Sequence, residues 1–546
     1  MILRTHLTNV EEAAARHPSR VAFKIPRANE KINVDGWHDV TYTQYLLDIE
    51  RFAAYWYHVL NGVAGIPQRS VIAICSRGYN YIDVLHVYGI FRAGYITQLV
   101  SLFPDAPYDS IRGIFESANP RAFVFESLYK NSEAVRNAPI PCYEALPSVD
   151  IAYSDKHSLP RFPKVEAEDT AIIAQTSGTS SGVSKVVPAS YRWLDAVGRK
   201  SSLMNVPSIP GKQDIYAWRC AHKKLRRDNQ TDVFSKSFME QLTFLIGTAY
   251  HAACVVQPTN GQPPTNELVA MIKQCQINKI YQFPLFLEKH LQAARSDPDI
   301  LSTLAALDGI MYGGSSLCAS EEEWAFQNNV NLINTYGCTE SGALLMSNGT
   351  RKDCRNLLRL YPGATLKFIP FVSQELDDSG SGLVELVIPP DAPECPDKSR
   401  RAEDNSFYTG DLFREIEPGA YVHCGRNGDW INMGNSQLCN TKDIEHNVRE
   451  LCGDIITGCV VVGENRPSPV LIVESHSENL KEAPAEIYCR IASYNAARHF
   501  HERIASEKMI IAVPPGTLPR TANKGTVRRR AVETMFKKDI DDIFCS

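Results

Sequence analysis

The chain has 546 residues, of which 44% are hydrophobic, 22% charged and 9% aromatic. This length and composition exclude a small disulfide-stapled module and wholesale disorder, and they predict several domain-sized units or one large core with an appendage. The 57 lysine and arginine residues against 62 aspartate and glutamate residues give a net charge of −5. Because a nucleic-acid binder usually carries a basic footprint, we expect no nucleic-acid partner.

Cysteine usage and the apolar stretches predict the compartment. The fifteen cysteines are scattered singly, without a CxxC pair or a Cys/His cluster at zinc-finger spacing, which favours a reducing environment. The N-terminus lacks the apolar core of a signal peptide. The most apolar stretch, residues 242–256, is interrupted by polar residues and is shorter than the about 20 residues that cross a bilayer. We therefore expect a cytoplasmic protein without a membrane span.

The first expected element is a short helix capped by Thr8 and Asn9, ahead of an Ala-rich run. Helical and strand spacings of apolar residues then alternate, which predicts an α/β core. The expected helices are 41–60, 80–94, 266–276 and 285–295, and the expected strands are 70–78, 95–100, 171–178, 251–258, 279–284, 308–314 and 330–337.

The pattern changes in the last third of the chain. After about Leu357, short alternating segments such as 382–390 predict a small β unit. Beyond Gly425, the segments 443–451, 458–463, 468–474 and 509–515 alternate between helix and strand, which predicts a second, α+β domain.

The segment from Ala171 to Lys185 is an apolar strand that runs into a loop rich in glycine and hydroxyl groups. Glycines let a backbone approach a ligand closely, and N–H and hydroxyl groups surround phosphate oxygens. We interpret the loop as a phosphate cradle, with a flexible surface loop as the alternative. Its residues are Thr176, Ser177, Gly178, Thr179, Ser180, Ser181, Gly182 and Lys185.

Two other readings of this loop are weaker. A Walker loop needs lysine directly after its second glycine, whereas two residues separate Gly182 from Lys185. The GxSxG pattern would make Ser180 a hydrolase nucleophile on a strand-to-helix elbow. Valines and Pro188 follow the loop and oppose such a helix, so a serine hydrolase ranks second.

The segment from Asn334 to Glu340 ends a strand with an aromatic residue, a glycine turn, a hydroxyl and a carboxylate. The Tyr336 ring suits stacking on a purine, and the Thr339 hydroxyl suits a hydrogen bond to a phosphate oxygen. The Glu340 carboxylate suits a magnesium ion, which prefers oxygen ligands. The alternative is a core aromatic beside a solvated surface charge.

Asp411 lies in an expected turn, in the segment from Tyr408 to Leu412. A carboxylate there suits the paired hydroxyls of a ribose, and Arg426 can donate to the same sugar or to a phosphate. The alternative is a pair of β-turns that use Gly and Asp.

The near-terminal segment 515–530 displays Lys524 on a loop stiffened by prolines. A basic solvated tail is the alternative interpretation of its charges.

Together, in this order, these four elements resemble the adenylate-forming superfamily of acyl-CoA synthetases, luciferases and nonribosomal-peptide adenylation domains. The resemblance covers nearly the whole chain, and from YTGDL onward it is greatest to fungal nonribosomal-peptide-synthetase-like proteins. It implies that a carboxylic acid attacks the α-phosphate of ATP to give acyl-AMP and pyrophosphate. An acceptor thiol or amine then displaces AMP.

The resemblance also implies roles for individual residues. Lys524 matches the mobile catalytic lysine, Thr339 and Glu340 match the α-phosphate and Mg²⁺ contacts, and Asp411 and Arg426 match the ribose ligands. The remaining nucleotide-binding positions are the phosphate cradle, the turn at Gly313, Gly314 and Ser315, and the strand end at Asn334, Thr335, Tyr336 and Gly337.

Some positions depart from the family pattern. Lys524 precedes Gly525, whereas the family usually has glycine before lysine, and Asn432 stands where lysine is common. Gly428 occupies the expected hinge between two domains. Ser235 stands where amino-acid-activating members carry an aspartate, which predicts an aryl, acyl or keto acid as substrate.

We therefore expect an α/β N-terminal core over residues 1–424 and a small mobile α+β domain over residues 425–546. The expected function is an acid–thiol or acid–amine ligase of secondary metabolism that uses ATP and Mg²⁺. Because the sequence ends soon after Lys524, we expect an external acceptor, which is CoA, a carrier-protein thiol or an amine. The alternatives are a serine hydrolase using Ser180 and a non-catalytic nucleotide-binding protein.

Overall fold

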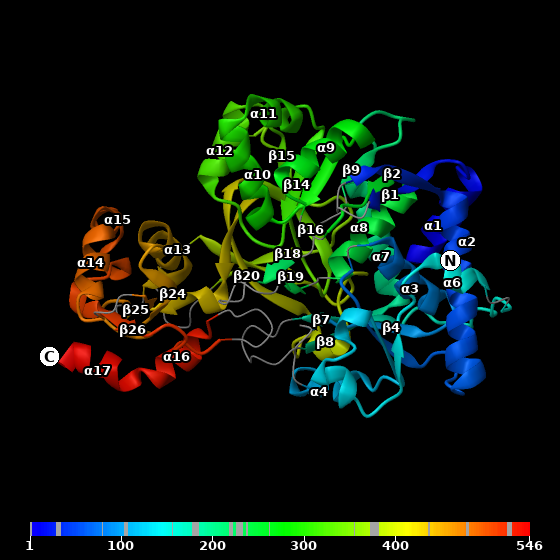
Figure 1. Cartoon of the computed structure of the whole chain (residues 1–546). Helices are drawn as coiled ribbons and strands as arrows, with labels where there is room; N and C mark the ends of the chain where they lie inside the picture. The colour runs from blue at the N-terminus through cyan, green and yellow to red at the C-terminus, as the bar shows by residue number, and fades with distance from the viewer. Residues whose placement is uncertain are drawn as a thin grey trace.

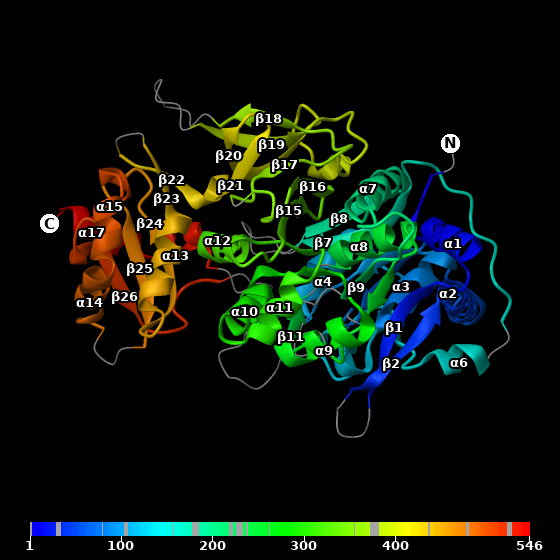
Figure 2. The same ribbon diagram turned by 90° about the horizontal axis from the view of Figure 1, so that it is seen from above.

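The computed structural model describes the chain except for short segments. The described residues are 3–28, 34–78, 80–102, 108–154, 157–176, 185–217, 222–224, 233–235, 238–260, 263–353, 355–371, 382–434, 437–476, 480–520 and 527–545. A large part and a smaller C-terminal part lie side by side in both ribbon views (Figures 1 and 2).

The largest sheet in the described residues has thirteen strands. Its central strands run parallel from β1 to β15, and from β15 onward the neighbouring strands are antiparallel. In spatial order they are β18 (Lys367–Pro370), β19 (Leu383–Ile388), β20 (Phe407–Glu417), β21 (Ala420–Arg426), β17 (Leu358–Leu360), β16 (Gly342–Ser347), β15 (Leu332–Cys338), β14 (Gly309–Gly313), β13 (Lys279–Gln282), β9 (Ile215–Ala217), β12 (Cys254–Val256), β1 (Val21–Ala28) and β2 (Val34–Thr41).

This order corrects one expectation. The strands after Leu357 do not form a β unit of their own, because β17 pairs with β16 and extends the sheet that carries β13, β14 and β15. Alternating apolar residues predict strands there, but periodicity does not specify which neighbours they pair with.

A second sheet has six strands and carries the predicted phosphate loop at one edge. Its order is β6 (Cys142–Glu144), β5 (Ala122–Phe125), β3 (Val71–Cys75), β4 (Ile96–Leu99), β7 (Thr170–Thr176) and β8 (Lys185–Ser190). The other described strands outside the C-terminal sheet form two short pairs. These are β10 (His222–Lys224) with β11 (Val233–Ser235), and β22 (Trp430–Asn432) with β23 (Leu438–Asn440).

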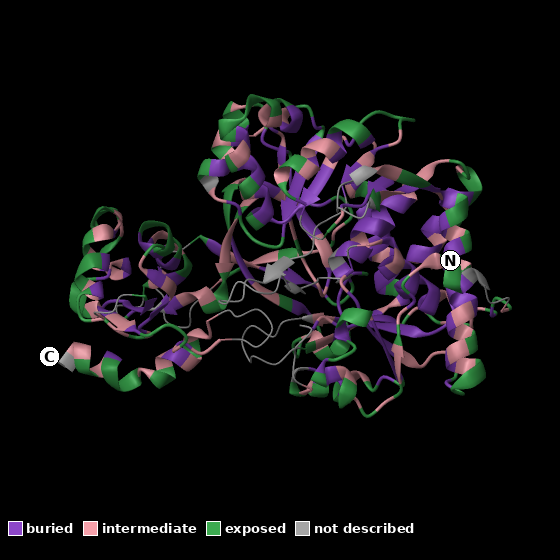
Figure 3. Cartoon of the chain, viewed as in Figure 1, coloured by how far each residue is buried: buried purple, intermediate pink, exposed green. Residues whose placement is uncertain are grey.

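Helices cover these sheets, whose strands are largely buried (Figure 3). At Gly89 two of them approach closely, since a Cβ atom there would lie 2.6 Å from Phe52 Cβ. The helices are α1 (His6–Arg16), α2 (Tyr42–Tyr57), α3 (Tyr81–Arg92), α4 (Asp109–Ala118), α5 (Glu133–Arg136), α6 (Val149–Ser154), α7 (Tyr191–Met204), α8 (Phe238–Tyr250), α9 (Thr265–Cys275), α10 (Pro284–Ser296), α11 (Pro298–Ala305) and α12 (Ala319–Gln327).

The first helix begins earlier than its sequence predicts. Thr5, not Thr8 or Asn9, is the N-cap, and its side chain accepts a hydrogen bond from the Thr8 backbone N–H. Asn9 is buried and donates instead to the Ile246 carbonyl at 3.0 Å. The Asn9 side chain, which the sequence predicts to cap the helix, therefore makes a tertiary contact instead.

The C-terminal part has its own three-stranded sheet with an apolar cluster on each face. All members of these two clusters come from Ile431 onward, and alternate residues of each strand point to opposite clusters. The elements are β24 (Ile456–Val462), β25 (Val470–Ser475), β26 (Ile510–Val513), α13 (Thr441–Cys452), α14 (Ala483–Arg490), α15 (Ala492–Ala497), α16 (Arg529–Met535) and α17 (Lys537–Cys545). The expected α/β architecture with a small α+β part is confirmed.

The helices in the described ranges include none that is long and apolar enough to cross a membrane.

Buried histidines make stability depend on pH. His86 is 1% exposed, accepts from Trp56 Nε1 at 3.0 Å through Nδ1, and donates through Nε2 to the Leu146 carbonyl at 3.1 Å. This pairing requires a neutral ring, and burial lowers the pKa of His86 to about 4. Unfolding releases a ring whose pKa is about 6.5, so the unfolded state takes up a proton first as the pH falls.

Stability should consequently fall as the pH drops from about 6.5 towards 4. Between pH 7 and pH 5, His86 should contribute about 2 kcal/mol to that loss. Urea unfolding of His86→Gln, whose amide can replace both hydrogen bonds, should show a smaller difference between the two pH values. His499→Gln, at an exposed position, is the control; equal differences in both variants would contradict the assignment.

Candidate active site

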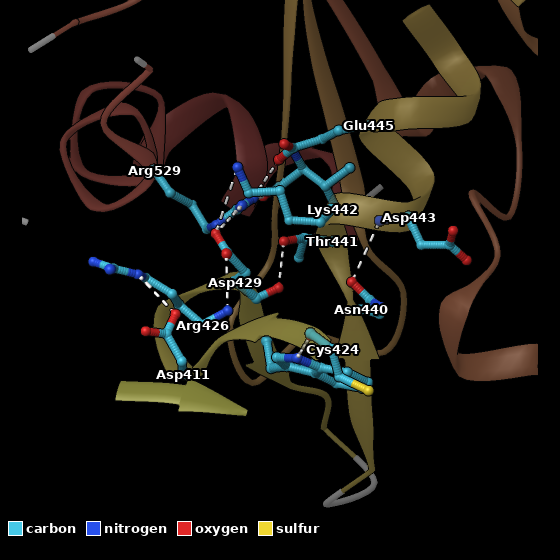
Figure 4. A network of polar contacts seen from close by, with 12 residues as sticks. Asp411, Cys424, Arg426, Asp429, Asn440, Thr441, Lys442, Asp443, Glu445 and Arg529 are labelled. Carbon is cyan, nitrogen blue, oxygen red and sulfur yellow. Dashed lines mark hydrogen bonds and ion pairs between the residues drawn. The ribbon is translucent and has the colours of Figure 1, made fainter. Parts of the chain in front are cut away.

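Asp411 lies at the centre of a polar cluster formed by β15, β20 and β21. It is 4% exposed, and it accepts from Tyr336 Oη at 2.7 Å and from Arg426 Nε at 3.1 Å. His423 Nε2 lies 3.4 Å from the same carboxylate. Figure 4 shows Arg426 directed towards Asp411. The structure thus brings together three residues that the sequence places up to 90 positions apart.

The Asp411 carboxyl group stays ionised within this cluster. Burial raises the pKa of this carboxyl, but His423, the Arg426 charge and the Tyr336 hydrogen bond outweigh burial and hold the pKa below its usual value. Asp411 was expected in a turn and instead lies within β20, opposite Arg426 of β21. The antiparallel pairing of the two strands places the carboxylate beside the guanidinium.

Tyr336 presents its ring beside two other aromatic residues. Phe413 meets it edge-on at 5.0 Å between ring centroids, and His423 lies 5.6 Å away at an interplanar angle of 31°. Burial raises the pKa of Tyr336, so the phenol remains protonated and donates to Asp411. The sequence did not identify His423, because nothing in its local pattern marks it.

Two of the predicted glycines lie where a side chain does not fit. A Cβ atom at Gly313 would lie 2.5 Å from both the carbonyl oxygen and Oγ1 of Thr335, and one at Gly337 would lie 2.5 Å from the Gly342 carbonyl. Gly314 follows with φ +88°. The ends of β14 and β15 are therefore packed backbone against backbone.

The other predicted residues at these strand ends have different environments. The Thr335 hydroxyl donates to the Tyr312 carbonyl at 2.8 Å, and Thr335 is buried. The Asn334 backbone N–H donates to Ser347 Oγ at 2.8 Å. Ser315 is exposed, and Thr339 is half-buried.

Glu340 lies in the turn between β15 and β16, near Arg400. Its side chain is 14% exposed, and Oε1 lies 3.9 Å from Arg400 Nη2, beyond hydrogen-bonding distance. The Glu340 carboxylate and the Thr339 hydroxyl are oxygen donors of the kind that Mg²⁺ prefers, so these residues fit that ion.

Helix α7 holds the backbone of this turn. Trp193 Nε1 donates to the Glu340 carbonyl at 2.8 Å, and Lys200 Nζ donates to the Ser341 carbonyl at 2.9 Å. Lys200 also pairs with Glu394 at 3.4 Å, and both side chains are buried. Burial lowers the pKa of Lys200, while Glu394 opposes this effect. Nothing in the sequence indicates these contacts, which span more than 140 positions.

The family resemblance implies that Glu340 holds Mg²⁺, so Trp193→Phe should raise the Mg²⁺ concentration that half-saturates pyrophosphate exchange several-fold. The Glu340 carbonyl loses its donor, while the aromatic packing is kept. The loss of one such hydrogen bond costs about 1 kcal/mol, so the fold should persist. The measurement is a Mg²⁺ titration of pyrophosphate exchange. Trp37→Phe is the matched control, since Trp37 Nε1 also donates to a carbonyl, that of Gln257, at 3.0 Å. Equal Mg²⁺ dependence in the two variants would contradict the role.

The predicted phosphate cradle lies mostly outside the described residues. The structure describes its two ends, Thr176 of β7 and Lys185 of β8, which pair in antiparallel register. The chain after the cradle continues as the strand β8, with Lys185 as its first residue. A nucleophile elbow and a Walker loop both need a helix there, so this geometry disfavours both.

Lys524 also lies outside the described residues, but the base of its loop is described. Arg520 and Val527 form an antiparallel bridge across the segment that carries Lys524. Glu474, which is fully buried, accepts from Arg520 Nη2 at 2.5 Å and from the Leu518 backbone N–H at 2.9 Å. A buried carboxylate therefore anchors the start of this loop.

The segment after Arg426 is held by charges from the C-terminal part (Figure 4). Asp429 accepts from the Arg426 backbone N–H at 3.1 Å, and its Oδ1 lies 3.7 Å from Arg529 Nη2. Arg529 also pairs with Glu445 at 2.6 Å. Among the described residues, no atom lies within 4 Å of the position that a Cβ would take at Gly428, the expected hinge, and Gly428 has no positive φ. This orientation therefore makes no use of glycine's conformational freedom there.

The side chains of Asn432 and Ser235 lie outside the described residues.

Comparison with known proteins establishes the family. The model for the AMP-binding enzyme matches residues 10–367, and the model for the AMP-binding enzyme C-terminal domain matches residues 428–546. The chain belongs to the AMP-binding enzyme family, which confirms the resemblance to adenylate-forming enzymes.

Curated fungal relatives include proteins of similar and of greater length. The chain is 28% identical over 534 residues to the AMP-binding domain-containing enzyme iboA of Amanita muscaria, covering 94% of this chain and 98% of that protein. It is 25% identical over 558 aligned positions to a carboxylic acid reductase of Neurospora crassa, covering 99% of this chain but only 50% of the reductase.

Solved structures share the fold at low identity. The o-succinylbenzoate CoA synthetase of Bacillus subtilis, in complex with its acyl-adenylate intermediate, has a TM-score of 0.71 at 14% identity and covers 98% of this chain and 99% of its own. The structure of McyG A-PCP with phenylalanyl-adenylate has a TM-score of 0.72 at 13% identity, covering 99% and 85% of the two chains.

Proposed function

We propose that this protein is an ATP-dependent ligase that activates a carboxylic acid as acyl-AMP and transfers the acyl group to a thiol or amine acceptor. The observation that carries the proposal is the cluster of Tyr336, Asp411 and Arg426, in which Tyr336 belongs to β15, the strand that leads to Glu340. A carboxylate oxygen of the substrate attacks the α-phosphorus, the bond to the β-phosphate breaks, and pyrophosphate leaves.

Different residues are proposed to bind the different parts of ATP. In this proposal Asp411 and Arg426 hold the ribose, the Tyr336 ring stacks on adenine, and the hydroxyl-rich cradle from Thr176 to Lys185 surrounds the phosphates. The ionised state of Asp411 suits hydrogen bonds from sugar hydroxyls. Mg²⁺ bound through Glu340 would neutralise phosphate charge, and Lys524 would donate to the carboxylate and the α-phosphate.

The domains are proposed to alternate around Gly428. Residues 1–424 would bind ATP and the acid, and residues 425–546 would carry Lys524 to and from them. One orientation presents Lys524 for adenylation, and another clears a path for CoA, a carrier-protein thiol or an amine. Family membership and the two separate apolar clusters of the C-terminal part support this division.

The test is carboxylate-dependent ATP–pyrophosphate exchange across a library of acids. Exchange with at least one acid is the expected result. ATP binding without any exchange would instead indicate a non-catalytic nucleotide-binding protein. Fluorophosphonate labelling that Ser180→Ala abolishes would indicate a hydrolase.

We expect the active acids to lack a free α-ammonium group. A buried ammonium needs a paired carboxylate, and Ser235 offers only a neutral hydroxyl at the position that the family resemblance matches to the aspartate of amino-acid-activating members. Asp232 is the alternative partner for an ammonium group. Exchange should therefore be at least tenfold faster with an aryl, acyl or keto acid than with the corresponding α-amino acid. Faster exchange with the amino acid than with its deaminated analogue would contradict this expectation.

A further inference from the structure

We propose that Cys318, His446 and Glu450 form a binding site for a zinc-type divalent transition-metal ion. One ligand atom from each residue lies within 4.8 Å of the others, in the part of the chain that the structure describes. Cys318 is half-buried, and the other two are exposed, so an ion can reach the group from solvent. The site is separate from Glu340, the residue proposed to hold Mg²⁺.

Two of the ligands are already at metal-binding separation. His446 and Glu450 are four positions apart on α13 and therefore share one face of the helix. His446 Nε2 lies 3.4 Å from Glu450 Oε1. Zinc bonds of about 2 Å at a tetrahedral angle separate a nitrogen and an oxygen ligand by about 3.3 Å. The pair needs little rearrangement to chelate an ion.

Cys318 supplies the third ligand and selects the metal. It is the residue before α12, its side chain does not cap that helix, and its Sγ lies 3.1 Å from Ser320 Oγ. Thiolate, imidazole and carboxylate together suit Zn²⁺, whereas Mg²⁺ and Ca²⁺ prefer oxygen ligands alone. Binding would release the thiol proton to solvent, and water would complete a four-coordinate site.

Two acidic side chains of the large part lie near the proposed ligands. Glu288 of α10 is close enough to His446 for their charges to interact, and Glu321 of α12 lies near Glu288. Arg295 pairs with Glu321 at 3.0 Å.

The ion would connect the two parts of the chain. Cys318 belongs to the large part, and α13 belongs to the C-terminal part; α12 and α13 are neighbours in Figure 2. An ion bound to all three ligands would hold the C-terminal part in this orientation. This consequence rests on the proposed function, in which the two half-reactions need different orientations; metal binding itself does not.

Binding is tested with Co²⁺ as the probe, because a cobalt–thiolate bond gives a near-ultraviolet charge-transfer band that oxygen ligands do not. The wild-type chain and the exposed-cysteine control Cys489→Ser should show the band, and Zn²⁺ should displace it. Cys318→Ser should abolish the band, and His446→Gln and Glu450→Gln should each weaken Co²⁺ binding at least tenfold. Absence of the band from the wild-type chain, or its persistence in Cys318→Ser, would overturn the site.

The connecting role is tested by adding Zn²⁺ to the two half-reactions. One half-reaction should be inhibited at least tenfold more than the other, and Cys318→Ser should remove the difference. Equal inhibition of both half-reactions, unchanged by Cys318→Ser, would place Zn²⁺ at the magnesium position and overturn the connecting role. If the chain has no adenylation activity, the proposed function fails, while the Co²⁺ band still decides whether the metal site exists.

Discussion

Lys524→Ala should lower the rate of carboxylate-dependent pyrophosphate exchange by about 100- to 1,000-fold, the usual cost of removing one charged donor from a developing transition state. Negative charge gathers between the attacking carboxylate and the α-phosphate, and the lysine would neutralise it there. ATP affinity should change little, because the interaction strengthens mainly in the transition state. The measurements are exchange kinetics and equilibrium binding of ATP.

Two further results separate this role from a general loss of structure. Lys508→Ala, which removes an exposed lysine of the same part of the chain, should leave exchange unchanged. Lys524→Ala should still transfer the acyl group from supplied acyl-AMP, since adenylation is then bypassed. Near-wild-type exchange in Lys524→Ala would refute the assignment.

Features that depend on residues close together in the sequence could be predicted. A strand followed by glycines, hydroxyls and a charged residue is typical of a turn that can bind a ligand, so the sequence indicates the segments around Tyr336, Asp411 and Lys524 as a candidate site. The structure brings Tyr336 and Asp411 together, although Asp411 lies in a strand. Helices such as α3, α9 and α10 and strands such as β3, β4 and β13 lie where apolar spacing predicts them. The predicted cap of the first helix was wrong because the Asn9 side chain donates a hydrogen bond to the Ile246 carbonyl, 237 positions away.

Long-range pairings could not be predicted. Nothing near Trp193 or Lys200 in the sequence indicates that α7 holds the carbonyls of Glu340 and Ser341. The contribution of His423 depends on the register of β20 and β21, which a bulge shifts. Strand order likewise depends on the packing of whole sheets, which is why the β unit expected after Leu357 proved to be part of the main sheet.

Glu474 is one of these unpredicted residues, and from its position we expect it to orient the segment that carries Lys524, the proposed catalytic residue. Its carboxylate is fully buried in β25, whereas Arg520, its partner, is 31% exposed and directly precedes the segment with Lys524. A Cβ atom at Gly458 would lie 2.5 Å from Arg520 Nη2 and 3.0 Å from Glu474 Oε2. The pair therefore depends on the absence of a side chain at residue 458.

Glu474→Gln should lower the kcat of pyrophosphate exchange about tenfold or more while changing the KM for ATP little, because the loop loses a charge-assisted anchor worth about 1.5–3 kcal/mol. Gly458→Ala should have the same effect by displacing Arg520, although it leaves Glu474 intact. Glu321→Gln is the matched control, since it breaks a partly buried ion pair with Arg295 that does not touch this loop. If Glu474 has only a structural role, both variants should have a lower free energy of unfolding but a normal kcat in the folded fraction. A positioning role requires a selective loss of kcat in both Glu474→Gln and Gly458→Ala.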